Sequence, residues 1–139
     1  VKRRMELLGT VRGIEVYDDF AHHPTAIETT LDGARKRLGE RKLWAIIEPR
    51  SNTMRMGSHK DGLAHSARLA DEVIWYQPEG LDWDLQPVIA ASSNKAEVSR
   101  SLDEIIARVV NEAGEGDAVV IMSNGGFGGL HQKLITALS

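Results

Sequence analysis

Four polar segments of this sequence carry side chains that could bind an anion or a nucleotide. They span residues 18–24, 48–55, 76–79 and 123–129. Each directly follows an apolar run that predicts a strand, and open α/β sheets bind their ligands beyond the carboxyl ends of the strands. We therefore expect the four segments to meet at one edge of one sheet.

Asp18 and Asp19 close the first of these strands. Carboxylates only accept hydrogen bonds, so they suit the hydroxyls of a ribose or the water shell of a hard cation. Neighbouring residues on an extended segment point to opposite sides, which predicts that at most one of the two faces a ligand. The competing interpretation is that one of them caps the helix that follows.

Histidines are present, but their spacing does not favour a metal site. His22 and His23 are direct neighbours, whereas a helical chelate places its histidines three or four residues apart. His59 and His65 fall on different faces of a predicted helix. We expect these histidines to cap a helix or to contact phosphate, and we expect no metal in this chain.

The segment 48–55 combines two guanidinium groups with small polar side chains, namely Arg50, Ser51, Asn52, Thr53 and Arg55. A guanidinium donates in parallel to two anionic oxygens, so the segment could clamp a carboxylate or a phosphate. The alternative is that both arginines are simply solvated.

The segment 123–129 holds four glycines around Phe127 and precedes a predicted helix. Glycines let backbone N–H groups approach a ligand closely and let the chain adopt positive φ, which favours an anion-binding site at the helix start. The alternative is a tight turn without a ligand. The segment is no dinucleotide fingerprint, because it follows the last strand and too little chain remains for the required acid.

The spacing of Gly57 and Gly62 matches a phosphate-binding P-loop, but Leu63 stands where that loop needs its lysine. The chain therefore has no cradle for a triphosphate. A nucleotide bound here must share its site with another domain.

The elements that position these segments alternate along the chain. We predict strands at 15–19, 43–47, 72–76, 87–90 and 117–122, and helices at 24–38, 58–70, 98–113 and 130–138, with the opening residues 1–8 also extended. This alternation predicts an α/β fold: a doubly wound, mostly parallel open sheet of Rossmann-like type, with helices on both faces and room for an antiparallel edge strand.

The composition of the chain excludes several classes of function. The 139 residues predict a single domain. Zero cysteines exclude disulfides, thiolate zinc sites and cysteine nucleophiles. A net charge of −3 provides no basic field for nucleic acid or an anionic membrane, and no apolar run approaches a membrane span or a signal peptide. Because the chain opens on Val1 in an extended pattern, we expect it to be one domain of a longer protein.

Several stretches resemble the carboxy-terminal domain of the Mur ligases, the ATP-dependent enzymes that build the peptide stem of peptidoglycan. Residues 18–25 read Asp-Asp-Phe-Ala-His-His-Pro-Thr, and the lead-in is Lys2-Arg3-Arg4. Residues 48–54 and 123–133 are similar to the branch of the family that recycles murein peptides. The resemblance covers nearly the whole chain.

The resemblance implies a reaction. ATP, with Mg²⁺, phosphorylates the carboxylate of UDP-N-acetylmuramate, and the amine of L-alanyl-γ-D-glutamyl-meso-diaminopimelate attacks the acyl phosphate. It also implies a cytoplasmic enzyme in which this chain, residues 1–139, is a lid that closes on its own central and amino-terminal domains. The central domain would hold the P-loop and the metal. The nearest alternative within the family is a UDP-N-acetylmuramate–L-alanine ligase.

By the same resemblance, Arg4 and either Asp18 or Asp19 contact the ATP ribose, and His22 lies near the γ-phosphate and the incoming substrate. Tyr76 and Gln77 align with the stretch through which a diaminopimelate-adding relative reads its substrate. That stretch lacks its arginine here, and Arg50 or Arg55 would replace it. The full set expected at the substrate comprises His22, His23, Arg50, Ser51, Asn52, Thr53, Arg55, Tyr76, Gln77, Ser123, Asn124, Gly125, Gly126 and Phe127.

Two other classes of protein compete with this interpretation. A phosphoacceptor receiver domain has a similar fold and paired acids, but it needs an aspartate after a middle strand and a lysine after the last one. This sequence has Glu48-Pro49 and Ser123-Asn124 there. A non-catalytic module that binds small anions would share the fold, and it would bind its ligand without a partner domain.

Overall fold

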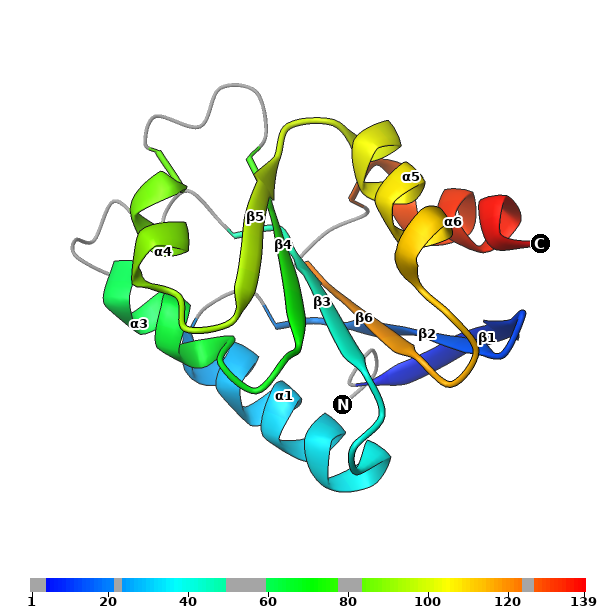
Figure 1. The fold of residues 1–139 in the computed structure, drawn as a ribbon, viewed down its shortest axis with the longest axis horizontal. Coiled ribbons are helices and arrows are strands. Elements are labelled where there is room, and N and C mark those ends of the chain that lie inside the picture. Colours follow the sequence, from blue (N-terminus) through cyan, green and yellow to red (C-terminus); the bar gives the residue numbers. More distant parts are fainter. Residues whose placement is uncertain (1–4, 22–23, 50–59, 78–83, 124–126) are drawn as a thin grey trace.

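A six-stranded sheet lies between two layers of helices (Figure 1). The computed structural model describes residues 5–21, 24–49, 60–77, 84–123 and 127–139. The strands are β1 (Glu6–Val11), β2 (Ile14–Asp19), β3 (Leu43–Ile47), β4 (Glu72–Tyr76), β5 (Lys95–Ser99) and β6 (Ala118–Met122). Their order is β1-β2-β6-β3-β4-β5, and every neighbouring pair is parallel except β1 and β2.

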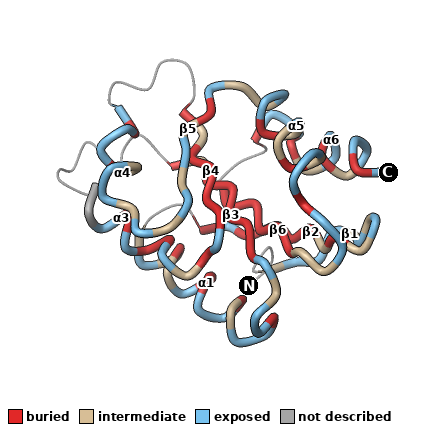
Figure 2. Tube along the Cα trace, in the orientation of Figure 1, coloured by how far each residue is buried: buried red, intermediate tan, exposed pale blue. Residues whose placement is uncertain are grey.

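The helices cover both faces, as the alternation predicts. On one face lie α1 (Pro24–Leu38), α3 (Lys60–Ser66) and α4 (Gln86–Ala91), and on the other lie α5 (Leu102–Glu112) and α6 (Leu130–Leu138) (Figure 1). Each layer closes its own apolar core on the sheet. All residues of β3 and β6 are buried, because both strands are covered on both faces (Figure 2). The predicted fold class, including its antiparallel edge strand, is confirmed.

The edge strand β1 joins β2 through a two-residue turn. Arg12 and Gly13 both have positive φ, at 56° and 79°. Positive φ at both central residues is typical of the turn that joins two strands through two residues, because the twist of this turn matches the twist of the strands. Of the opening predicted as extended, residues 6–8 are confirmed as part of β1, Met5 has a φ of 50°, and residues 1–4 lie outside the described residues.

Two predicted elements are wrong, and the helix predicted at 58–70 ends early, since α3 stops at Ser66. Residues 87–90 form part of helix α4 instead of a strand, because Pro87 stands in its first turn, where its missing N–H costs nothing. The helix predicted from Val98 begins only at Leu102, because residues 95–99 form the edge strand β5. The hydroxyl of Ser101 caps α5 by accepting a hydrogen bond from the amide of Glu104.

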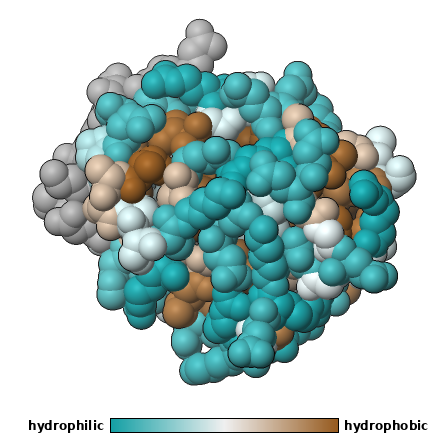
Figure 3. Space-filling model, in the orientation of Figure 1, coloured by the Kyte–Doolittle hydropathy of each residue, from teal (hydrophilic) through white to brown (hydrophobic). Residues whose placement is uncertain are grey.

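The face seen in Figure 3 is mainly hydrophilic, and its hydrophobic residues lie in separate patches. Within the described ranges, no helix is long and apolar enough to cross a membrane.

A cluster of ion pairs closes the edge of the sheet where the parallel strands begin. The buried carboxylate of Glu72 pairs with Lys42 and Arg108, and both cations lie over the ring of Trp44. A buried carboxylate needs such partners, because its desolvation is otherwise uncompensated. These ion pairs and ring contacts therefore stabilise this edge of the sheet.

The Lys42–Glu72 pair predicts how stability depends on pH. The hydrogen bond that Lys42 donates to Glu72 raises the pKa of Lys42 above its ordinary value of 10.5. The stabilisation is complete below that ordinary value, and it is lost as the pH rises through the higher pKa of the folded state. We expect the urea concentration at the midpoint of unfolding to decrease as the pH rises above about 10.5, and to decrease less in Lys42→Met.

Lys36→Met is the matched control, since the Lys36 ammonium is exposed and pairs with Asp32 on its own helix. Equal alkaline losses in Lys42→Met and in the unaltered chain would contradict the assignment.

Candidate functional site

The strand ends that carry the predicted site meet at one edge of the sheet. Asp19 lies opposite Met122 on β6, Met122 lies opposite Ile47 on β3, and Ile47 lies opposite Trp75 on β4. All four strands are parallel, so the segments that follow them leave the sheet at the same edge. The prediction of one common edge is confirmed for the residues that the structure describes. We call this edge, with Asp18, Asp19, Glu48, Tyr76, Gln77 and Ser123, the strand-exit rim.

Asp19 fixes three parts of the chain at the rim. Its Oδ2 accepts a hydrogen bond from the amide of Met5 at 2.9 Å. Its Oδ1 accepts hydrogen bonds from the amide of Ala21 at 2.8 Å and from the hydroxyl of Thr30 at 3.0 Å. Only 3% of Asp19 is exposed. The carboxylate thereby ties the entry of the chain, the loop after β2 and helix α1 to one point.

Asp18 points to the other face of the sheet. Its Oδ1 lies 2.8 Å from Nε2 of His131, in the first turn of α6. The expectation that the two acids face opposite sides is therefore confirmed. Asp19 is bonded to the loop before α1 and to Thr30 inside that helix, so it anchors α1 from the side.

Backbone hydrogen bonds connect the segments that leave the rim. The amide of Ser123 donates to the carbonyl oxygen of Asp19 at 3.2 Å, and the amide of Glu48 donates to that of Met122 at 2.9 Å. Gln77 is buried, and its side-chain oxygen accepts a hydrogen bond from the amide of Leu85 at 3.2 Å. Gln77 thus holds the far end of the segment that follows β4.

The glycine-containing segment reaches α6 through a left-handed stretch. Phe127, Gly128 and Gly129 have φ values of 50°, 59° and 77°, which agrees with the predicted need for positive φ. Phe127 adopts this conformation without being a glycine, and its buried ring packs against Tyr76 at 5.2 Å between centroids. The packing of the ring compensates for an unfavourable backbone conformation.

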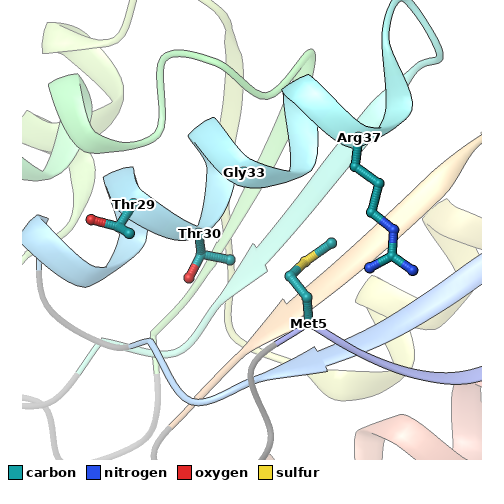
Figure 4. A pocket seen from close by; sticks show the side chains of 5 residues that line it. All are labelled: Met5, Thr29, Thr30, Gly33 and Arg37. Atoms are coloured by element: carbon teal, nitrogen blue, oxygen red, sulfur yellow. The ribbon is translucent and has the colours of Figure 1, made fainter. Parts of the chain in front are cut away.

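A cavity of about 230 Å³ opens beside the entry of the chain. It is lined by Met5, Thr29, Thr30, Gly33 and Arg37 (Figure 4). The Thr30 hydroxyl is already bonded to Asp19, and the Thr29 hydroxyl is bonded to the carbonyl oxygen of Thr25. Of the lining side chains, Arg37 provides the charged group, and it lies over the ring of Tyr17 at 5.5 Å.

Many predicted site residues lie outside the described residues. They are Arg4, His22, His23, Arg50, Ser51, Asn52, Thr53, Arg55, Asn124, Gly125 and Gly126. The structure brings together Asp18, Asp19, Tyr76, Gln77, Ser123 and Phe127 along the rim. Within the described ranges, no group of three or more acids or histidines is placed to hold a metal ion.

Sequence reasoning missed Met5, Thr30 and His131 as partners of the two acids. One signal was available for Thr30, a polar residue between Ile27, Leu31 and Ala34 on the buried face of α1. His131 and the amide of Met5 had no such signal, because their role depends on contacts that are distant in sequence.

The fold and the rim define a Rossmann-like α/β domain in which the parallel strands β2, β6, β3 and β4 end at one edge of the sheet. The chain belongs to the Mur ligase family: residues 3–125 match the model of the Mur ligase, glutamate ligase domain. The recognition made from residues 18–25, 48–54 and 123–133 is thereby confirmed.

The relatives point to one branch of that family. Over 139 residues, the chain is 48% identical to UDP-N-acetylmuramate–L-alanyl-γ-D-glutamyl-meso-2,6-diaminoheptandioate ligase of Escherichia coli (strain K12), covering 99% of this chain and 30% of the relative. A crystal structure of murein peptide ligase from Psychrobacter arcticus 273-4 has a TM-score of 0.92 and 59% identity, covering 99% of this chain and 30% of that one.

A second solved structure matches from end to end. It is a domain from a putative ligase of the same name from Haemophilus ducreyi 35000HP, with a TM-score of 0.84 and 43% identity, and the match covers 98% of this chain and 100% of that one. A domain of this extent thus crystallises on its own. The present chain spans about a third of the length of the full-length relatives.

Replacing Asp19 tests its role as the common anchor. Asp19→Ala leaves the amides of Met5 and Ala21 and the hydroxyl of Thr30 without their acceptor, and we expect a loss of about 3 kcal/mol in the free energy of unfolding. Thr30→Val removes one of the three bonds and should cost about 1 kcal/mol. Urea unfolding of the 139-residue chain measures both, and a loss in Asp19→Ala no larger than in Thr30→Val would count against the anchor.

Proposed function

We propose that this chain is the carboxy-terminal domain, residues 1–139, of a longer ATP-dependent ligase that joins L-alanyl-γ-D-glutamyl-meso-diaminopimelate to UDP-N-acetylmuramate. The observation that carries the proposal is the similarity over 99% of the chain to a murein peptide ligase, at 59% identity and a TM-score of 0.92. The strand-exit rim gives the proposal a physical basis, since it collects the segments that such a ligase would direct at its substrates.

The proposed reaction forms an amide bond in two steps. The carboxylate of UDP-N-acetylmuramate takes the γ-phosphoryl group of ATP, which releases ADP. The amine of the tripeptide then attacks the acyl carbon, loses a proton and expels inorganic phosphate. Because water would hydrolyse the acyl phosphate, a domain that closes over the site and excludes water protects the intermediate.

This chain would supply contacts at the edges of the nucleotide and the peptide. Arg4 and one of Asp18 and Asp19 would contact the ATP ribose, and His22 would lie near the γ-phosphate. Arg50 or Arg55 would bind a carboxylate of the peptide, with Ser123, Asn124 and Gly125 beside it. The tie between Asp19 and the amide of Met5 supports this arrangement, because it fixes the residue next to Arg4 at the rim.

The phosphates of ATP and the Mg²⁺ would be held mainly outside this chain, by a central domain. Leu63 in place of the P-loop lysine supports that division. Asp19 already accepts three hydrogen bonds from the protein, and the described residues offer no cluster of metal ligands. The substrates are nucleotide-linked precursors, so we place the enzyme in the cytoplasm, with its own central and amino-terminal domains as partners.

The choice of substrate tests the proposal. The whole enzyme, supplied with ATP, Mg²⁺ and UDP-N-acetylmuramate, should form the ligated product with the tripeptide and release phosphate in equal amount. L-alanine should be a poor replacement. Preference for L-alanine would instead assign the chain to a UDP-N-acetylmuramate–L-alanine ligase, and tight anion binding by the 139 residues alone, with no ligation, would favour a non-catalytic module.

The guanidinium groups of the segment 48–55 offer a more specific test. In the whole enzyme, Arg50→Ala should raise the KM for the tripeptide about tenfold to a hundredfold, the loss expected for one charged hydrogen bond, with less effect on the KM for ATP. Arg55→Ala is the matched comparison, since either residue can play this role. If Arg50→Ala raised the KM for ATP and not the KM for the tripeptide, Arg50 would instead be assigned to the nucleotide site.

A further inference from the structure

The three exposed large hydrophobic side chains of the described residues gather where the polypeptide enters the domain. Leu7 and Leu8 lie at the start of β1, with 48% and 37% exposed, and Phe20 follows the end of β2, with 45% exposed. These two strand ends are neighbours, because Glu6 lies opposite Asp18 in the antiparallel pair. Exposed apolar side chains that are grouped, instead of scattered singly, indicate a contact with another protein surface.

The cavity beside the entry of the chain adjoins this group. Leu7 lies opposite Tyr17 in the hairpin, so both side chains are on the side of the sheet that α1 covers, and the Arg37 guanidinium lies over the Tyr17 ring. Figure 4 shows Met5 and Arg37 extending into the same space, one from the start of the hairpin and one from α1. We call this region the entry surface, and it is formed by Met5, Leu7, Thr29, Gly33 and Arg37.

Gly33 leaves room in the entry surface that the domain itself does not use. It lies inside α1, where glycine is a poor helix former, and a Cβ added there would meet no atom within 4 Å. Gly33 is also not one of the glycines with positive φ. Neither the backbone nor a neighbouring side chain of the described residues therefore requires glycine here. The space beside Gly33 is available to a side chain from outside the domain.

Arg37 gives the entry surface a positive charge. Among the described residues, its guanidinium lies 5.5 Å from the centre of the Tyr17 ring, and no carboxylate forms an ion pair with it. The two preceding residues differ, because Arg35 and Lys36 both pair with carboxylates. A guanidinium held over an aromatic ring keeps its N–H donors for the carboxylate of a partner.

The part of the enzyme that precedes this chain is the occupant that fits the entry surface. In the proposed function the chain is the carboxy-terminal domain, and it spans 30% of its Escherichia coli relative, so most of the polypeptide comes before it. That polypeptide reaches the domain at Met5, which lines the cavity and is bonded through its amide to Asp19. A rotation of the domain about a hinge at its entry moves the neighbouring surface least, so a contact there persists.

We propose that the entry surface is the docking site for the domain that precedes this chain in the whole enzyme. The partner places an apolar side chain in the cavity of about 230 Å³ and a neighbouring carboxylate on Arg37. The inference rests on one part of the proposed function, namely that the chain is the carboxy-terminal domain of a longer protein. It does not depend on which reaction that protein catalyses.

Photocrosslinking in the whole enzyme, without substrates, tests the docking. Thr29 is replaced by the photoreactive amino acid p-benzoylphenylalanine, because Thr29 is an exposed residue at the cavity. We expect irradiation to join this position to a peptide from the part of the same molecule before Val1, and mass spectrometry to find an acidic residue beside an apolar one in that peptide. The same probe at Asp32, an exposed residue of α1 that does not line the cavity, should give no such product.

Two substitutions in the entry surface should weaken the crosslink for different reasons. Arg37→Glu reverses the charge, and Gly33→Leu fills the cavity from the domain's own helix. We expect each to lower the crosslink yield about tenfold, the size of one lost charged or apolar contact. Lys133→Glu makes the same change of charge on α6, on the other face of the sheet, and should leave the yield unchanged.

Urea unfolding of the 139-residue variants separates lost docking from lost folding. Gly33→Leu should raise the midpoint of the isolated chain, because leucine is a better helix former than glycine, while it lowers the crosslink yield in the whole enzyme. Arg37→Glu and Lys133→Glu should have similar midpoints.

The products distinguish the possible occupants. Covalent dimers in place of the internal crosslink would overturn the inference and assign the entry surface to a second copy of the chain. Absence of a crosslink specific to position 29 would also overturn it, as would a yield that Arg37→Glu and Gly33→Leu leave unchanged. The same preparation is assayed for ligation of the tripeptide. An enzyme that gives the internal crosslink and does not ligate the tripeptide would contradict the proposed reaction and leave the docking site standing.

Discussion

The strand-exit rim depends on the hydrogen bonds that the carboxylates of Asp18 and Asp19 accept. Neighbouring residues of a strand must face opposite sides of the sheet, so two adjacent acids at the end of β2 reach both helical layers. Asp19 accepts from Met5, Ala21 and Thr30 on the side of α1, and Asp18 pairs with His131 on the side of α6. Burying a carboxylate without hydrogen-bond donors is unfavourable in free energy, so each acid stays bonded to donors of the surrounding segments.

This arrangement suits a domain that moves as one piece. In the proposed function this domain closes over the substrates, and a closing domain excludes water best when the ends of its loops are fixed. Here the loop after β2, the segment after β6 and the entry of the chain share anchors on two consecutive residues. The opposite edge of the sheet, with Glu72, Lys42 and Arg108, carries ion pairs that serve stability instead.

The fold was predictable from the sequence where the pattern is strong. Continuous apolar runs identify β3 and β6, and Pro24 with the apolar spacing behind it identifies α1. The errors fell on weak patterns. Strand β5, Lys95–Ser99, is a half-exposed edge strand with charged residues, and α4 is a helix of 6 residues whose proline marks a start instead of an end.

The arrangement of the described residues at the strand-exit rim was predictable in part, and their pairings were not. Alternation along β2 placed Asp18 and Asp19 on opposite faces, and strand polarity placed Tyr76 and Ser123 at the same edge. No local pattern could reveal that His131, 113 positions away, pairs with Asp18, because only the packing of α6 on the sheet brings them together. The same holds for Met5 and Asp19, whose contact depends on the antiparallel hairpin.

The most direct test is NMR detection of scalar couplings across hydrogen bonds in the 139-residue chain. The account requires the amide nitrogens of both Met5 and Ala21 to couple to the carboxyl carbon of Asp19, and the Nε2 of His131 to couple to that of Asp18. The backbone bond from Glu48 to Met122 provides the internal reference. Absence of the couplings to both acids in spectra that resolve the Glu48 reference would contradict the claim that the two carboxylates organise the rim.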